Sequence, residues 1–210
     1  AVAVPEGRVI GLRSKKNGEL DARAAPALDD AVAAADAILV GPGMMEADGG
    51  VAIVRRVLRA DGDPVLVVDA APMAAFGTTS RGRGARPIAG GEPIGQRRVI
   101  ITPHAGEMAR LCGLDRREVA ARPALVARET ALRLGVTVVL KGSETHVVGP
   151  DGIAFVNREA GCVGLGTSGS GDTLAGVITG LAARGVDPVH AACWGVYLHG
   201  RAGDALARRV

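Results

Sequence analysis

Four short aliphatic runs, each followed by a polar or glycine-containing turn, constrain the fold most strongly. They cover residues 37–40, 65–68, 99–101 and 136–140. Continuous apolar runs of this length are typical of parallel strands that are buried on both faces. Because segments with helical spacing alternate with them, such as Val51, Val54 and Leu58, the sequence predicts an α/β fold with a mostly parallel central sheet flanked by helices.

The helix ends carry clear signals. Asp115 with Glu118 forms a capping-box pattern, and Pro123 is placed to open a further helix that ends at Gly135. We expect Leu125 and Leu132 on the inner side of that helix.

Two further helices are predicted near the end of the chain. The strongest helical pattern begins near Gly171 and ends before Gly185. Asp187-Pro188 then supplies an N-cap and a first-turn proline for a last helix that runs towards Ala205. On that helix we expect His199 to have only a core or surface role.

A β-hairpin is predicted at one edge of the sheet. Residues 145–148 and 153–156 flank the turn Gly149-Pro150-Asp151-Gly152, and such a pair of short strands around a turn favours antiparallel pairing.

Composition limits the remaining function classes. The 210 residues, 48% of them hydrophobic, suit one domain with a sizeable core. The net charge is only +3, and the basic residues are interleaved with acidic ones, so we expect no nucleic-acid partner. The stretch 77–96, with its arginines, is interpreted as a loop.

Cysteine and histidine usage points to an intracellular chain without a resident metal. The three cysteines form no disulfide framework or CxxC motif, and the four histidines show no HxxxH pair. No apolar run approaches the roughly 20 residues of a membrane span. We therefore expect no protein metal site, no membrane partner and a cytoplasmic location.

The sharpest chemical signal is a glycine-rich run from Gly164 to Gly171, followed by Asp172 at the start of the predicted helix. Backbone N–H groups of such a loop and the helix N-terminus form an anion site fit for a phosphate. A carboxylate beside it can accept the proton of a substrate hydroxyl that attacks phosphorus. We predict Asp172 as the catalytic base, and Gly169, Ser170 and Gly171 as nucleotide contacts. The alternative is an acidic first-turn residue after a flexible loop.

Two other phosphate motifs are rejected. Gly164 to Gly169 matches GxGxxG, but a dinucleotide fingerprint needs a second strand ending in an acid about 20 residues further on. That region is the turn Gly185-Val186-Asp187-Pro188. No Gly-Lys-Ser/Thr occurs, so a Walker A loop is absent.

The turn after residues 136–140 reads Lys141-Gly142-Ser143-Glu144-Thr145. Lys141 and Thr145 can contact a phosphate or a ribose, and Gly142 permits close backbone approach. An ordinary solvated turn is the alternative interpretation.

The turn Thr102-Pro103-His104-Ala105-Gly106-Glu107 follows residues 99–101. In open α/β sheets, ligands bind at the carboxyl ends of the strands, so His104 and Glu107 are candidate ligand contacts. The alternative is that Thr102 or His104 caps the next helix, with Glu107 as a first-turn carboxylate.

Two more turns lie at predicted strand ends. Gly41-Pro42-Gly43 is a rigid turn that either meets a ligand or is only a turn. Asp69 closes the buried run 65–68, where it either orients a ligand or caps the next segment.

Taken in order, these turns resemble the ADP/ATP-dependent NAD(P)H-hydrate dehydratase family, which has the ribokinase-like fold and repairs hydrated nicotinamide cofactors. The resemblance rests on the turns beginning at Gly41, Thr102 and Lys141 and on the run 166–172, and it spans most of the chain. The TPHxGE and GSGD-type pieces are fairly specific together, whereas GSGD alone fits any ribokinase-like kinase.

The resemblance implies a set of roles. The reaction would phosphorylate the hydroxyl of hydrated NADH or NADPH, and phosphate elimination would restore the ring. ADP or ATP with Mg²⁺ would be the phosphoryl donor, and a homo-oligomer is expected. Residues 141–145 and Gly171 would hold the nucleotide. The hydrated nicotinamide would be held by Gly43, His104 and Asp172.

The chain also departs from the family pattern. It is expected to be a single ribokinase-like domain over residues 1–210 that lacks the family's N-terminal strand and helix. Cys162 replaces a usual Asn, and Asp69-Ala70-Ala71-Pro72 replaces the usual Asp-Ala-Asp-Ala-Leu. Two alternatives therefore stay open: a sugar or vitamin kinase of the same fold, and a catalytically silent nucleotide-binding protein.

Overall fold

The computed structural model describes residues 7–77, 94, 97–158 and 165–208. Its centre is a six-stranded sheet in the order β1-β2-β3-β4-β5-β6. The strands are β1 (Ala37–Val40), β2 (Val65–Val68), β3 (Val99–Ile101), β4 (Thr137–Leu140), β5 (Thr145–Val148) and β6 (Ala154–Asn157). The first four pair in parallel, and the last two continue the sheet as an antiparallel hairpin. The predicted fold class is confirmed.

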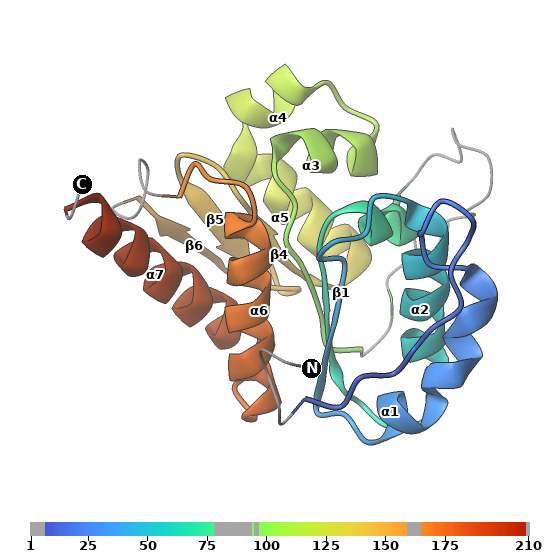
Figure 1. Ribbon diagram of the computed structural model, residues 1–210. Coiled ribbons are helices and arrows are strands. Elements are labelled where there is room, and N and C mark those ends of the chain that lie inside the picture. Colours follow the sequence, from blue (N-terminus) through green and yellow to red (C-terminus); the bar gives the residue numbers. More distant parts are fainter. Residues whose placement is uncertain (1–6, 78–93, 95–96, 159–164, 209–210) are drawn as a thin grey trace.

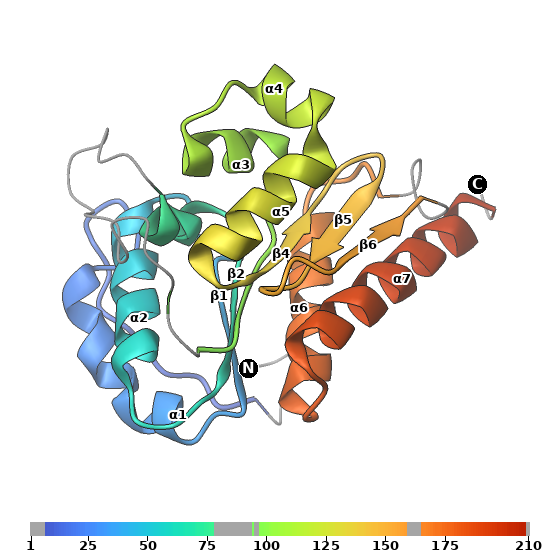
Figure 2. The same ribbon diagram turned by 180° about the vertical axis from the view of Figure 1, so that it is seen from behind.

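Helices cover both faces of the sheet (Figure 1; Figure 2). One face carries α6 (Ser170–Ala183) and α7 (Pro188–Ala207). The other carries the remaining helices, which are η1 (Ala22–Leu28), α1 (Asp29–Ala33), α2 (Ala47–Arg59), η2 (Ala71–Phe76), α3 (Ala105–Cys112), α4 (Arg116–Ala121) and α5 (Pro123–Leu134).

The strand sequences explain this layering. Side chains alternate between the faces of a strand, and β2 is apolar at every position. Val65 and Val67 enter the core beneath α6 and α7, whereas Leu66 and Val68 enter the core on the opposite face. All four are at most 1% exposed. A sheet buried on both faces needs this kind of continuous apolar strand.

Most predicted helix ends are confirmed. Asp115 and Glu118 form a reciprocal capping box, and α5 begins at Pro123 and ends before Gly135, which is left-handed with φ 68°. Asp187 accepts hydrogen bonds from two backbone N–H groups at the start of α7. The hairpin is confirmed too, with β6 one residue later than predicted.

The predicted inner face of α5 is wrong. Leu125 and Leu132 are 45% and 48% exposed, and the buried stripe consists of Val126, Ala127, Thr130, Ala131 and Leu134. The helix has two apolar stripes, and the broader one faces the core because it covers more of the sheet. Leu132 instead packs at the rim, against the hairpin turn at Gly152.

Two predictions concern residues beyond those described. Most of the predicted loop 77–96 and the Cys162 departure lie outside the described residues. Within the described part of the chain, no helix combines the length and apolar character needed to cross a membrane.

Candidate nucleotide site at the strand ends

Three polar side chains meet where neighbouring parallel strands end. Asp69 follows β2, Thr102 follows β3 and Lys141 follows β4. The Thr102 hydroxyl donates to Asp69 Oδ1 over 2.6 Å, and Lys141 Nζ donates to the same oxygen over 2.8 Å. Asp69 and Thr102 are 3% and 0% exposed. The strand order thus brings together three residues that are far apart in the sequence, and they form one hydrogen-bonded cluster.

The Lys141 turn faces the start of α6. A Cβ placed on Gly171 would lie 3.2 Å from Lys141 Nζ, so the ammonium group lies directly beside the first turn of that helix. A cavity of about 480 Å³ opens at this point. Its lining includes the predicted residues His104, Lys141, Gly142, Ser143, Thr145, Ser170 and Gly171.

The start of α6 is suited to an anion. Gly169 is left-handed, with φ 85°, and no side chain caps the helix there. The first-turn N–H groups of a helix have no partner within the helix, and the helix dipole gives this end partial positive charge. The Ser170 N–H donates to the Thr167 carbonyl oxygen over 3.3 Å. Gly171 lines the cavity with the Lys141 ammonium group beside it, and a helix start next to a cation suits a phosphate.

Asp172 lies one residue beyond this contact, in the first turn of α6. Its side chain is exposed and is not part of the cavity lining. The structure therefore places the predicted base beside the anion site rather than inside it.

His104 and Glu107 take the capping role that was one of the two open interpretations. His104 Nδ1 accepts from the backbone N–H groups of Gly106 and Glu107 over 2.9 and 3.2 Å. Glu107 Oε2 accepts from the His104 N–H over 2.8 Å. Since Nδ1 is an acceptor, a neutral ring carries its proton on Nε2. His104 also lines the cavity, where its Nε2 lies 3.5 Å from Glu107 Oε1.

Besides Asp172, five predicted site residues are not part of the cavity lining: Gly43, Asp69, Glu107, Glu144 and Gly169. Glu144 forms an ion pair with Arg158 at 3.4 Å, and Glu107 serves the helix cap. Gly43 is exposed after β1, with φ 77°.

Part of the cavity lining was missed by sequence reasoning. It includes Asn157 at the end of β6, Leu174 on α6, and Val196, His199 and Gly200 on α7. His199 Nε2 lies 3.4 Å from Ser170 Oγ, and burial lowers the pKa of His199, with the charge of Lys141 lowering it further. The spacing of Val196, His199 and Gly200 on one helical face was the available signal.

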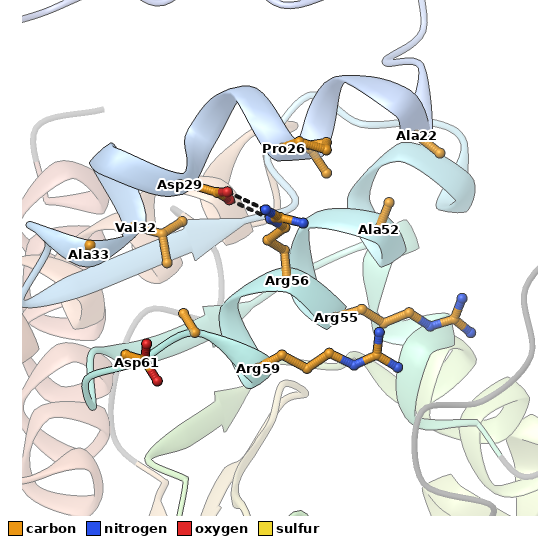
Figure 3. A pocket seen from close by; sticks show the side chains of 12 residues that line it. Ala22, Pro26, Asp29, Val32, Ala33, Ala52, Arg55, Arg56, Arg59 and Asp61 are labelled. Atoms are coloured by element: carbon orange, nitrogen blue, oxygen red, sulfur yellow. Dashed lines mark hydrogen bonds and ion pairs between the residues drawn. The ribbon is translucent and has the colours of Figure 1, made fainter.

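A second, larger cavity of about 630 Å³ lies between η1, α1 and α2 (Figure 3). Arg55, Arg56 and Arg59 line it along α2, and Arg56 is paired with Asp29. Asp61 belongs to the turn before β2, so this cavity reaches the amino ends of the strands. Ligands in open α/β sheets bind at the carboxyl ends, which favours the smaller cavity as the functional site.

Solved structures define the class of protein. A ribokinase-like superfamily protein from Enterococcus faecalis V583 superposes with a TM-score of 0.70 at 30% sequence identity, covering 89% of this chain and 61% of that one. The fold is therefore ribokinase-like.

The family is narrower than this class. A family model described as NAD(P)H-hydrate dehydratase matches residues 10–210. An ADP-dependent (S)-NAD(P)H-hydrate dehydratase from Xanthomonas campestris is 44% identical over all of this chain and 67% of its own length. The chain belongs to the NAD(P)H-hydrate dehydratase family.

Further matches are to proteins named as members of the same family. The Bacillus subtilis ADP-dependent (S)-NAD(P)H-hydrate dehydratase is 34% identical over 78% of this chain and 53% of its own length. A crystal structure of the ADP/ATP-dependent enzyme from Bacillus subtilis, co-crystallised with ATP/Mg²⁺, superposes with a TM-score of 0.67 at 33% identity, covering 86% and 61% of the two chains. The chain thus spans about two thirds or less of the length of these relatives.

Proposed function

We propose that this chain binds ADP or ATP in the strand-end cavity and uses it to dehydrate hydrated NADH or NADPH. The observation that carries the proposal is the Lys141 ammonium group held against the uncapped start of α6, in a member of this family.

The cavity has separate regions for the two ends of a nucleotide. Its polar wall at Lys141 and Gly171 suits the phosphates, and Ser143 and Thr145 lie along the same turn. The same lining contains the apolar side chains of Leu165, Leu174 and Val196, which suit contact with a base. A volume of about 480 Å³ falls within the range of small-molecule sites.

The residues present fit a magnesium ion that arrives with the nucleotide. The described residues contain no cluster of three or more His, Cys, Asp or Glu side chains that could hold a metal. Mg²⁺ commonly keeps several waters and binds through one or two carboxylates plus substrate phosphates. In this site the nucleotide phosphates and water would supply the ligands, and Mg²⁺ would supply charge neutralisation at the phosphates.

The chemistry assigned to the chain is positioning and proton transfer. Asp172 accepts the proton of the hydrate hydroxyl as the hydroxyl oxygen forms a bond to the terminal phosphorus of ADP or ATP, and the bond from that phosphorus to its bridging oxygen breaks to release AMP or ADP. Lys141 and the first-turn N–H groups of α6 stabilise the negative charge on the phosphoryl oxygens. Elimination then breaks the carbon–oxygen bond, releases orthophosphate and a proton from the neighbouring carbon, and restores the ring double bond.

The substrate would approach from the side of β1 and β3. His104 lines the cavity, and Gly43 lies exposed at the end of β1. These two residues and Asp172 are proposed to contact the hydrated nicotinamide.

The test is recovery of NADH from its hydrate. The protein is incubated with (S)-hydrated NADH, Mg²⁺ and either ADP or ATP, and both nicotinamide absorbance and orthophosphate are followed. We expect both to rise together with ADP, since the curated relatives carry that nucleotide in their names. A stable phosphorylated alcohol would instead indicate a kinase, and thermal stabilisation by nucleotide without turnover would indicate a silent binding protein.

A further inference from the structure

The Lys141 ammonium group does not stand free at the cavity wall. Its nitrogen lies 2.8 Å from Asp69 Oδ1, and the side chains of Lys141 and Asp69 are 20% and 4% exposed. Thr102 donates to the same Asp69 oxygen over 2.6 Å. The Thr102 hydroxyl and the Lys141 ammonium group thus share one acceptor atom, Asp69 Oδ1.

This arrangement fixes the position of the cation. A buried carboxylate is costly unless it is paired and hydrogen-bonded, so Asp69 favours the geometry in which Lys141 reaches it. A lysine side chain otherwise has four rotatable bonds and samples many rotamers. An ammonium group has three donors, and one is used on Asp69, which leaves donors for a group at the start of α6.

The backbone around Asp69 is constrained on two sides. A Cβ on Gly41 would lie 2.1 Å from the Asp69 carbonyl oxygen, so the end of β1 packs directly against this residue. Ala70 then adopts φ 53° and ψ −140°, a conformation that an L-residue with a side chain rarely adopts. Strain of this kind costs about 1–3 kcal/mol and clusters at functional sites.

A purely stabilising role explains these features less well. A buried ion pair is often no more stabilising than apolar residues of the same volume, and the strands that precede Asp69 and Thr102, β2 and β3, are apolar throughout. The pair is instead aimed at the cavity, with Lys141 Nζ 3.2 Å from the Cβ position of Gly171.

We propose that Asp69, itself oriented by Thr102, is a positioning residue that holds the Lys141 ammonium group at the start of α6 for the transferred phosphoryl group. This inference rests on the proposed nucleotide site. Asp69 acts through Lys141 and contacts no substrate, so its loss should slow turnover more than it weakens substrate binding.

The first test measures kcat and KM for both substrates in Asp69→Asn. We expect kcat to fall on the order of 10²-fold, the effect of misplacing a catalytic group by about 1 Å, with KM for the hydrated cofactor changed less than threefold. Wild-type kcat in a folded Asp69→Asn protein would overturn the proposal.

The second test is a double-mutant cycle with Lys141→Met. If Asp69 acts through Lys141, adding Asp69→Asn to Lys141→Met should lower kcat no further. Independent, multiplicative losses in the double variant would show that Asp69 has a separate role and would contradict the proposal.

Thr102 supplies a test that does not depend on the buried charge. Thr102→Val removes the donor to Asp69 and should lower kcat about 10-fold, whereas Thr102→Ser keeps the hydroxyl and should restore it. Equal activity of the two variants would contradict the proposal, even if Asp69→Asn fails to fold. Failure of wild-type protein to bind ADP or ATP would instead reject the nucleotide site itself.

Discussion

The two cavities of this protein show why volume and basic charge do not identify a site. The cavity along α2 is the larger, at about 630 Å³ against 480 Å³, and three arginines line it. All three arginines lie on the one helix, and Arg56 already has a carboxylate partner in Asp29. The strand-end cavity combines backbone donors, a helix start and a cation anchored on a buried carboxylate. The strand-end cavity differs from the α2 cavity because its polar groups come from several elements and are held in place by hydrogen bonds.

The largest expected difference between the two cavities is the loss of turnover when one carboxylate at each of them is replaced by an amide. Asp172→Asn should lower turnover of hydrated NADH on the order of 10²–10⁴-fold, because it removes the proposed base, and should leave nucleotide affinity nearly unchanged. Asp61→Asn, beside the α2 cavity, is the matched control and should keep wild-type kcat. Steady-state kinetics measure kcat of both variants, and calorimetry measures their affinity for ADP. Wild-type turnover by Asp172→Asn would show that Asp172 is not the base.

Substitution of a glycine with positive φ should lower the free energy of unfolding by different amounts in the two regions. Gly41, at the strand-end side, has φ 142° and the Asp69 carbonyl oxygen at its Cβ position, whereas Gly62, near the α2 cavity, has φ 99° and open space around it. Gly41→Ala should cost about 3 kcal/mol through steric overlap and backbone strain, and Gly62→Ala only about 1–2 kcal/mol. Urea denaturation measures both, and equal losses would show that the contact between Gly41 and Asp69 is not tight.

The contact between Gly171 and Lys141 gives a smaller effect. Gly171→Ala places a methyl group 3.2 Å from the ammonium nitrogen, which should displace it and weaken ADP binding about 10-fold, or about 1.4 kcal/mol. Gly176→Ala on the same helix has no heavy atom within 4 Å and should leave ADP affinity unchanged while raising stability by up to about 1 kcal/mol. Unchanged ADP affinity in Gly171→Ala would contradict the placement of Lys141.

The smallest effect concerns pH. His146 and His199, on the strand-end side, both have a pKa below the ordinary value, chiefly because burial disfavours the charged ring. The unfolded chain therefore binds more protons than the folded one below about pH 6.5, so the free energy of unfolding should fall as pH drops through that value. Melting curves from pH 7.5 to 5.5 test this, with His146→Gln expected to reduce the slope. A pH-independent melting temperature would contradict the direction of both pKa values.

Much of the fold was predictable because its signals are local. The four aliphatic runs matched four parallel strands. Asp115 and Asp187 marked helix starts by accepting hydrogen bonds from first-turn N–H groups, and Pro123 marked one through its fixed φ. The inner face of α5 was not predictable, since the helix carries two apolar stripes and packing on the sheet decides between them.

The candidate site was predictable only in part, because several of its contacts depend on how the strands and helices pack and not on local sequence. The turns after β3 and β4 and the start of α6 could be recognised from the sequence. The bond between Lys141 and Asp69 joins residues 72 positions apart and depends on the order of β2, β3 and β4. Asn157 and His199 reach the cavity because α7 packs against both α6 and the hairpin.

Hydrogen exchange with and without ADP tests the central claim most directly. If the nucleotide binds at the strand ends, ADP should slow amide exchange in residues 141–145 and 165–173 and leave residues 52–61 of the α2 region unchanged. Protection confined to residues 52–61, with none at the Lys141 turn or the start of α6, would contradict the account.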